Sequence, residues 1–381
     1  MRKRYLMAPG PVAVAPDVLL KMAEPIIHHR SPQFSAILEE VRGGLKYLFQ
    51  TRNDVLVLAS SGTGGMEASV ANLCAPGDTA VVVRGGKFGE RWAELCEAYG
   101  VRAVNVDVAW GRAVDPADVA AALEAHPEAR AVFVQAHETS TGVKHPVEAL
   151  GELVRPRPET VLVVDAISAL GVYDIRTDDW GLDVVVTGSQ KSLGLPPGLA
   201  MVSVSEKAWA LAERSTQPRY YFDFRRERKA LGRRTTAFTP AVSLIIGLER
   251  VLARVREVGL PALFAHHRRL AEGTRAGVRA LGLSLFPEAP SEAVTVIRAP
   301  EGIDGQEVVK LLREEYGITI AGGQAQAKGK IFRISHMGHL DEWDMLVALA
   351  AVERALHRLG HPVELGRGVA AAEAWFAGAA A

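Results

Sequence analysis

The sequence predicts an α/β fold in which a large, mostly parallel sheet is covered by helices on both faces. Short apolar runs of four to six residues alternate with longer amphipathic stretches as far as about residue 205. Polar and glycine-rich turns follow several of these runs, as at residues 59–65 and 188–198. Beyond residue 243 the order becomes helix, strand, helix and two strands, which predicts a smaller α+β domain.

The 381 residues are sufficient for two domains. We expect an N-terminal arm at 1–15, a large domain at 16–242, a small C-terminal domain at 243–368 and a flexible, alanine-rich tail at 369–381. Helical spacing of apolar residues predicts covering helices, for example from Phe34 to Leu48 and from Gly89 to Tyr99. The strands of the large domain are expected at Val55–Leu58, Thr79–Val83, Val101–Val106, Ala131–Gln135, Val161–Asp165, Val184–Thr187 and Leu199–Val204.

Composition argues against several classes of partner. The 44 basic and 44 acidic residues balance, so no global field favours nucleic acid or a cationic partner. The N-terminus is basic but lacks the apolar stretch of a signal peptide, and nowhere do 18 apolar residues run without a charge. The two cysteines, Cys74 and Cys96, fall in helix-like segments, which suggests buried thiols in a reducing compartment. Together these features predict a soluble cytoplasmic protein without membrane or nucleic-acid partners.

The loop Gly188–Gly198, with the sequence GSQKSLGLPPG, follows a buried apolar run and contains one lysine, Lys191. Burial lowers the basicity of an amine, and a partly desolvated lysine becomes a nucleophile towards carbonyl groups. Lys191 can therefore hold an aldehyde cofactor covalently. The alternative interpretation is a surface lysine in a strand-to-loop turn.

An apolar run that starts at Val161 ends in a carboxylate, Asp165. Asp165 precedes Lys191 by 26 residues. The run puts this charge at the carboxyl end of a buried strand, where open α/β sheets bind ligands. A carboxylate beside a pyridine nitrogen keeps that nitrogen protonated and lets pyridoxal phosphate withdraw electrons. The alternative role for Asp165 is a helix N-cap or a loop hydrogen bond.

The segments VVDAISALGV around Asp165 and VVVTGSQKSLGLPPG around Lys191 resemble the class V aminotransferases of fold type I. HETSTGV, at His137–Val143, is the third specific piece, and the similarity runs from Ala8 to about Leu359. It is nearest to the alanine–glyoxylate, serine–glyoxylate and serine–pyruvate aminotransferases. The resemblance implies a seven-stranded large sheet, the cofactor pyridoxal 5'-phosphate (PLP) and a homodimer with a shared active site.

The small residues of SSGTGG run directly into a helix, and such a turn lets a phosphate approach free N–H groups at the positive end of the helix dipole. The resemblance makes Thr63, Gly64 and Gly65 the phosphate cup. It places Phe88 over the cofactor ring, although Phe88 could instead pack on the following helix. The other contacts to PLP that it implies come from Thr139, Asp165, Ile167, Gln190, Lys191 and, across the dimer, Thr239.

Arg333 lies between apolar neighbours in IFRISHMGHL. A strand arginine that faces a cleft can bind a carboxylate bidentately, and the resemblance assigns Arg333 to the substrate carboxylate, with Gly10 near it. The alternative is an arginine salt-bridged on the surface. We expect no metal site, since the adjacent His28 and His29 do not share a helix face and no cluster of other ligands accompanies them.

The sequence therefore predicts a PLP-dependent aminotransferase with Lys191 and Asp165 as catalytic residues, acting on small-molecule amino acids and 2-oxo acids. The resemblance implies alanine or serine as donor and glyoxylate or pyruvate as acceptor, and the sequence does not rank alanine, serine and aspartate as donors. Two alternatives stay open: a class V cysteine desulfurase or related lyase, and a non-catalytic subunit that keeps the fold. A desulfurase needs a cysteine on a mobile loop, and neither Cys74 nor Cys96 falls on one.

Overall fold

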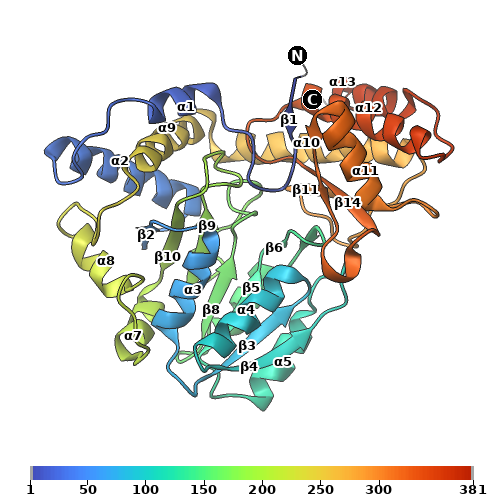
Figure 1. Cartoon of the computed structure of the whole chain (residues 1–381). Helices are drawn as coiled ribbons and strands as arrows, with labels where there is room; N and C mark the ends of the chain where they lie inside the picture. Colours follow the sequence, from blue (N-terminus) through green and yellow to red (C-terminus); the bar gives the residue numbers. More distant parts are fainter. Residues whose placement is uncertain (1–2, 379–381) are drawn as a thin grey trace.

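The structure is a computed structural model that describes residues 3–378. Within these residues the largest sheet has seven strands in the order β2-β10-β9-β8-β5-β3-β4 (Figure 1). Strand β10 is antiparallel to both neighbours and all other neighbouring pairs are parallel, as predicted. The strands are β2 (Asp54–Leu58), β3 (Thr79–Arg84), β4 (Arg102–Asp107), β5 (Ala131–Gln135), β8 (Val161–Asp165), β9 (Val184–Gly188) and β10 (Ala200–Val204).

Successive side chains of each strand face opposite sides of this sheet, so helices bury both faces. In β3, Val81 and Val83 belong to one hydrophobic core, whereas Ala80 and Val82 belong to the other. The first core is closed by α2 (Pro32–Phe49), α5 (Pro116–Ala125), α6 (Val147–Val154) and α9 (Val242–Val258). The second is closed by α3 (Gly62–Leu73), α4 (Lys87–Ala98), α7 (Glu206–Arg214) and α8 (Phe224–Leu231).

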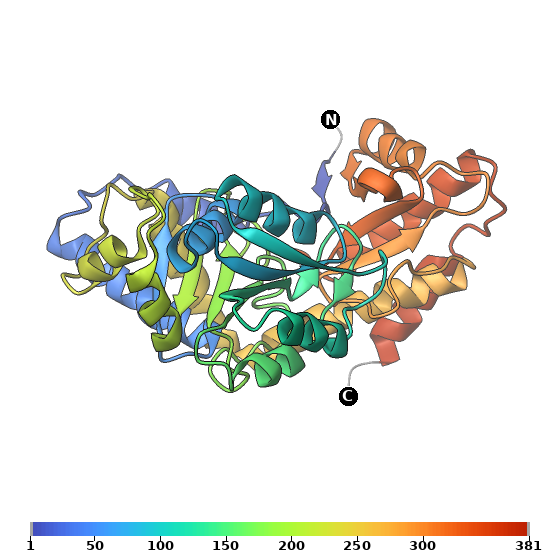
Figure 2. The same ribbon diagram turned by 90° about the horizontal axis from the view of Figure 1, so that it is seen from below.

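A second sheet, of three antiparallel strands in the order β11-β14-β13, lies beside the C-terminal helices (Figure 2). It has its own hydrophobic core, which contains Ile297, Phe332 and Ile334. Its strands are β11 (Val294–Arg298), β13 (Ala321–Gly322) and β14 (Ile331–Ser335). The accompanying helices are α10 (Leu260–Ala280), α11 (Gly305–Leu311), the π-helical turn η1 (Leu312–Tyr316), the 3₁₀ turn η2 (Ala325–Ala327) and α12 (Glu342–Arg358).

The N-terminal arm connects the two sheets. Its strand β1 (Tyr5–Leu6) pairs in parallel with β12 (Ile318–Thr319), and the Ser335 amide donates to the Met7 carbonyl at 2.9 Å. The arm then runs to α1 (Pro16–Met22), which packs on α9. Residues 8–11 are thereby held between the small sheet and the carboxyl ends of the large-sheet strands.

The C-terminal segment differs from the predicted flexible tail. Arg367–Gly378 forms helix α13, and residues 379–381 lie outside the described part. Phe376 is buried against α10, whose Arg269 donates to its carbonyl at 2.7 Å. The buried Glu353 carboxylate accepts the backbone N–H groups of Gly368 and Val369 at 2.7 and 3.0 Å, which satisfies donors at the start of α13. The alanine-rich composition of this segment does not indicate its contacts with Arg269 and Glu353.

The predicted domain boundary at residue 243 falls in the first turn of α9, which packs on α2 of the large part, and this division stays a prediction. The helix expected from Gly89 begins two residues earlier, at Lys87. Across residues 3–378, no helix is both long enough and apolar enough to cross a membrane.

Candidate active site

A cavity of about 100 Å³ lies at the carboxyl ends of the parallel strands, where an α/β sheet places ligands. Lys191 follows β9, Asp165 ends β8 and Thr139 lies after β5, so residues far apart in sequence meet there. Its lining consists of Gly62, Thr63, Phe88, Arg91, Thr139, Asp165, Ile167, Ser168, Gln190 and Lys191.

Lys191 is held in a tight loop directly after β9. The Gly194 amide donates to the Lys191 carbonyl at 2.9 Å, and the Leu195 amide closes a wider turn onto the Ser189 carbonyl at 3.0 Å. Burial lowers the pKa of the Lys191 amine to about 8, although the nearby Asp165 charge opposes this shift. A larger share of the amine is therefore neutral and nucleophilic near neutral pH than in a surface lysine.

The arm covers this amine. Lys191 Nζ donates to the carbonyl of Pro9, and a Cβ atom added to Gly10 would collide with the Lys191 side chain. Gly10 also has φ of +122°, a conformation that residues with side chains rarely adopt. The structure therefore places Gly10 beside the predicted site and explains why glycine is required there.

Asp165 is buried, and one of its oxygens, Oδ1, accepts the Ile167 amide at 2.8 Å. Loss of solvation raises the pKa of this carboxyl to about 7, which the Ile167 hydrogen bond opposes. Because Asp165 also lines the cavity, it can meet a positively charged or N–H group of a ligand there. Ile167 thus contributes both a lining side chain and the amide that orients Asp165.

Thr139 belongs to a buried hydrogen-bonded chain. Its Oγ1 lies 2.6 Å from Ser168 Oγ, and Ser168 Oγ lies 3.0 Å from His137 Nδ1. Burial lowers the pKa of His137 to about 3, so its imidazole is neutral and cannot place a charge in the site. The chain fixes the Thr139 hydroxyl at the cavity wall.

The predicted phosphate cup is only partly at the cavity. Thr63 lines it together with Gly62, a residue that we did not predict, at the first turn of α3. Gly65 is buried against the sheet instead, and a Cβ there would lie 2.7 Å from Val186. Small size at Gly65 therefore serves helix–sheet packing, and its predicted contact with the phosphate stays a prediction. Gly64 is close to Ser60 and does not line the cavity.

Arg91 is the functional side chain that sequence reasoning missed. Its Nη1 donates to Thr63 Oγ1 at 3.0 Å, and its guanidinium lies 4.9 Å from the centre of the Phe88 ring. Phe88 and Arg91 lie near the start of α4, three residues apart, which puts them on one helix face. That spacing from Phe88 was the signal available in the sequence. Ser168 and Gly62 were missed as well.

Arg333 on β14 is buried, and its guanidinium spans two segments of the fold. Nη1 donates to the Thr139 carbonyl at 2.8 Å, while Nε and Nη2 both donate to the Gly322 carbonyl, at 3.1 and 2.7 Å. Burial lowers its pKa to about 10, so the group stays positively charged at neutral pH. The edge that carries Nε and Nη2 has the geometry that a carboxylate requires.

Gln190 and Thr239 line different cavities. Gln190 lines the Lys191 cavity, and its buried Oε1 has no hydrogen-bond partner within the described residues. Thr239 lines another cavity, with Tyr221, Glu227 and Thr236, away from Lys191 of its own chain. Its predicted contact across a dimer stays a prediction.

Neither cysteine is available for chemistry at this site. Cys74 and Cys96 are both buried beneath the large sheet, and burial raises the pKa of both thiols, to about 12 for Cys96. A thiolate nucleophile needs the opposite conditions, exposure and a lowered pKa.

The chain matches the aminotransferase class-V family over residues 19–340. The chain belongs to the class-V aminotransferases. It is 43% identical over 375 residues to a Synechococcus protein named soluble hydrogenase, small subunit, with 97% of each chain covered. It is 38% identical over 377 residues to the L-aspartate–glyoxylate aminotransferase of Paracoccus denitrificans, covering 97% of this chain and 95% of that one.

A solved aminotransferase has nearly the same fold. The ureidoglycine–glyoxylate aminotransferase of Bacillus subtilis superposes with a TM-score of 0.95 at 31% identity, over 99% of both chains. The predicted fold type I and the predicted cofactor, PLP, are confirmed for this class-V aminotransferase.

The residues at the cavity of this class-V aminotransferase fit PLP. The amine of Lys191 suits its aldehyde, and the carboxylate of Asp165 suits its pyridine nitrogen. At the N-terminus of α3 the N-cap residue Ser61 makes no capping side-chain hydrogen bond, so amides there are available to a phosphate. The unpartnered Oε1 of Gln190 is a further polar group at the cavity wall.

Proposed function

We propose that this class-V aminotransferase transfers the amino group of a small amino acid, alanine or serine, to a 2-oxo acid, glyoxylate or pyruvate. The observation that carries this proposal is the joint placement of the Lys191 amine and the Asp165 carboxylate in one buried cavity, beside which Arg333 is held by Thr139. The two proteins described above that are named aminotransferases both have glyoxylate in their names, which supports glyoxylate as the acceptor.

In the proposed mechanism, the Lys191 amine would hold PLP. When bound, PLP would withdraw electrons from Cα of the amino acid. The Lys191 amine would take the proton from that Cα as general base and later return a proton as general acid. Its lowered pKa suits both steps, because each needs a group that exchanges a proton near neutral pH.

The remaining residues bind and orient. Asp165 would keep the pyridine nitrogen of PLP protonated, and Phe88 would pack against its ring. Thr139 would bind PLP through its hydroxyl, which the hydrogen bond to Ser168 holds in place. Arg333 exchanges the Gly322 carbonyl for the substrate carboxylate and gains a charge-assisted bidentate contact.

Glycine formation from glyoxylate tests this proposal. Purified holoprotein would be given glyoxylate with L-alanine, L-serine or L-aspartate as donor. We expect glycine to form faster with alanine or serine than with aspartate. The opposite ranking would overturn the donor assignment.

A second candidate is a non-catalytic subunit, which is favoured by the name of the 43% identical Synechococcus protein. The presence of Lys191, Asp165 and Arg333 at one site argues for catalysis instead. Absence of glycine with every amino donor, from protein that carries bound PLP, would favour the subunit role.

A further inference from the structure

A second cavity, of about 410 Å³, lies behind the Lys191 loop, and we call it the rear pocket. It is enclosed by α1, α9, α10 and the residues that follow β14. Figure 1 shows α9 leading into α10 along one side of the molecule, close to the arm. Its volume is within the range of small-molecule sites in proteins.

The walls of the rear pocket come from the three segments that carry proposed site residues. Leu193 and Gly194 follow Lys191, Leu340 follows the strand of Arg333, and Val18 follows the arm that carries Gly10. These segments are tied together behind the site, since the His339 amide donates to the Ala13 carbonyl at 2.9 Å. A molecule in the rear pocket would therefore touch each segment within eight residues of its functional group.

Apolar side chains dominate the rear pocket, among them Val18, Leu193, Val255 and Leu263. The positive charge of Arg254 is neutralised outside the pocket by Asp17, which also pairs with Arg250. Burial lowers the pKa values of His266 and His267, the latter to about 3, so both rings are neutral. The lining contains no carboxylate, and its one arginine is ion-paired.

His267 specifies the polar group of a ligand. It is buried, and its Nδ1 lies 3.0 Å from the His336 carbonyl, which can only accept a hydrogen bond. Nδ1 must therefore carry the proton, and Nε2 is left as an acceptor. A ligand that pairs with this ring needs an N–H or O–H donor.

We propose that the rear pocket binds a small, uncharged, largely apolar molecule with one N–H or O–H donor, of the kind represented by indole, and that its occupation alters amino-acid binding at the active site. The coupling follows from the shared segments, because a ligand that prefers one arrangement of the Lys191 and Arg333 loops shifts the population towards it. By linkage, amino-acid binding changes the affinity for indole by the same factor.

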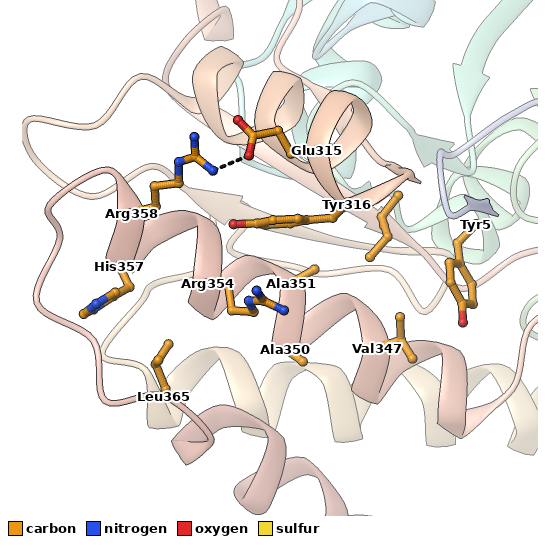
Figure 3. Close-up of a pocket in the computed structure, with 11 residues that line it drawn as sticks. Tyr5, Glu315, Tyr316, Val347, Ala350, Ala351, Arg354, His357, Arg358 and Leu365 are labelled. Carbon is orange, nitrogen blue, oxygen red and sulfur yellow. Dashed lines mark hydrogen bonds and ion pairs between the residues drawn. The ribbon is translucent and has the colours of Figure 1, made fainter. Parts of the chain in front are cut away.

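A larger groove, of about 760 Å³, lies between η1 and α12 and provides a control site (Figure 3). Its charged groups are already engaged: Arg354 lies 5.2 Å from the centre of the Tyr316 ring, and Arg358 pairs with Glu315. The segments that line this groove do not include the Lys191 loop. Val347 on α12 lines it and is partly exposed, so a larger side chain can be introduced there.

The test is calorimetric titration of the holoprotein with indole and with 1-methylindole, which lacks the N–H donor. We expect indole to bind once per chain and 1-methylindole to bind about threefold to tenfold more weakly, since one hydrogen bond is lost. Leu263→Trp, at a partly exposed position on the pocket wall, should weaken indole binding at least tenfold, whereas Val347→Trp should not. Thermal unfolding of both variants checks that they are folded.

Coupling is tested by repeating the indole titration with L-alanine present. We expect a changed indole affinity in the unsubstituted protein. Indole binding that survives Leu263→Trp, is lost in Val347→Trp, or is not saturable would overturn the site. Equal indole affinity with and without a bound amino acid would overturn the coupling. Neither result depends on which 2-oxo acid the enzyme uses.

Discussion

At the scale of single residues, Lys191 and Asp165 define the proposed chemistry. Burial shifts their pKa values in opposite directions. The pKa of the Lys191 amine falls to about 8, while that of the Asp165 carboxyl rises to about 7, because each charged form loses solvation. A pyridinium nitrogen beside Asp165 would favour its ionised form again, since opposite charges in contact stabilise each other.

Replacing Asp165 by asparagine should preserve cofactor binding and lower turnover by several powers of ten. A neutral amide cannot hold the pyridinium proton, so the cofactor loses its capacity to withdraw electrons. Turnover and bound PLP would be measured together, with Asp107→Asn as the control because Asp107 is exposed at the end of β4. Near-normal turnover of the Asp165 variant would show that another group protonates the nitrogen.

Replacing Arg333 by lysine should weaken amino-acid binding while leaving the affinity for PLP almost unchanged. Lysine keeps the charge but cannot form the second parallel hydrogen bond to a carboxylate. The loss should be about 1.5–3 kcal/mol, or roughly tenfold to a hundredfold in affinity. Titrations of both ligands check this, with Arg298→Lys on the neighbouring strand as control. If PLP binding fell instead, Arg333 would belong to the phosphate.

The strongest site residues were predictable because each has a local sequence signal. Lys191 and Asp165 follow apolar runs, so their place at strand ends could be inferred from the pattern alone. Ser168 has no such signal, and the spacing of Arg91 from Phe88 does not show its contact with Thr63, which is far away in the chain. Contacts of this kind exist only once the sheet is assembled.

At the scale of elements, the buried Glu138 carboxylate positions the start of α4. It accepts the amides of Phe88 and Gly89 at 3.0 Å each, together with the amide and hydroxyl of Ser140. Burial raises the pKa of Glu138, which these hydrogen bonds oppose. The carboxylate thus holds the helix turn that presents Phe88 and Arg91 to the cavity.

Glu138→Gln should destabilise the protein by about 1–3 kcal/mol, because the amide NH₂ group would face hydrogen-bond donors. The orientation of Phe88 should loosen as well, so the affinity for PLP should fall. Thermal unfolding and cofactor titration check both effects. Glu148→Gln is the matched control, since Glu148 is exposed in the first turn of α6. Unchanged stability would mean that Glu138 is protonated in the native protein.

The strands of the large sheet were predicted correctly, whereas helix α12 was missed and helix α13 was expected to be a flexible tail. The inner strands of the large sheet are rich in apolar residues because both of their faces are covered. Helix α13 has no comparable pattern, and it depends on Glu353 and on contacts with α10. The packing of Gly65 against Val186 can be known only from the position of the sheet.

At the scale of the whole molecule, the predicted homodimer gives Thr239 a role that its own chain does not. Thr239 lines a cavity without Lys191, which agrees with a contact to the other subunit's cofactor. Co-expression of a Lys191→Ala chain with a Thr239→Ala chain tests this arrangement. If each site combines Lys191 of one chain with Thr239 of the other, the mixed dimer contains one unaltered site.

The mixed dimer should then have about half of the normal turnover, with an unchanged affinity for PLP. Thr239→Ala homodimers should bind PLP about threefold to tenfold more weakly, as expected for one lost hydrogen bond. If the mixed dimer has the weakened affinity of the Thr239→Ala homodimer, both residues serve the same chain's site and the shared arrangement is wrong.

The central claim is that Lys191 holds PLP, and covalent labelling tests it most directly. Borohydride reduction of the holoprotein fixes the cofactor to the lysine that carries it, and peptide mapping identifies that residue. We expect the label on Lys191 and its loss in Lys191→Ala, with the fold intact. Lys87 and Lys144 are ion-paired with Glu90 and Glu292, and a cofactor label on either of them would contradict the assignment.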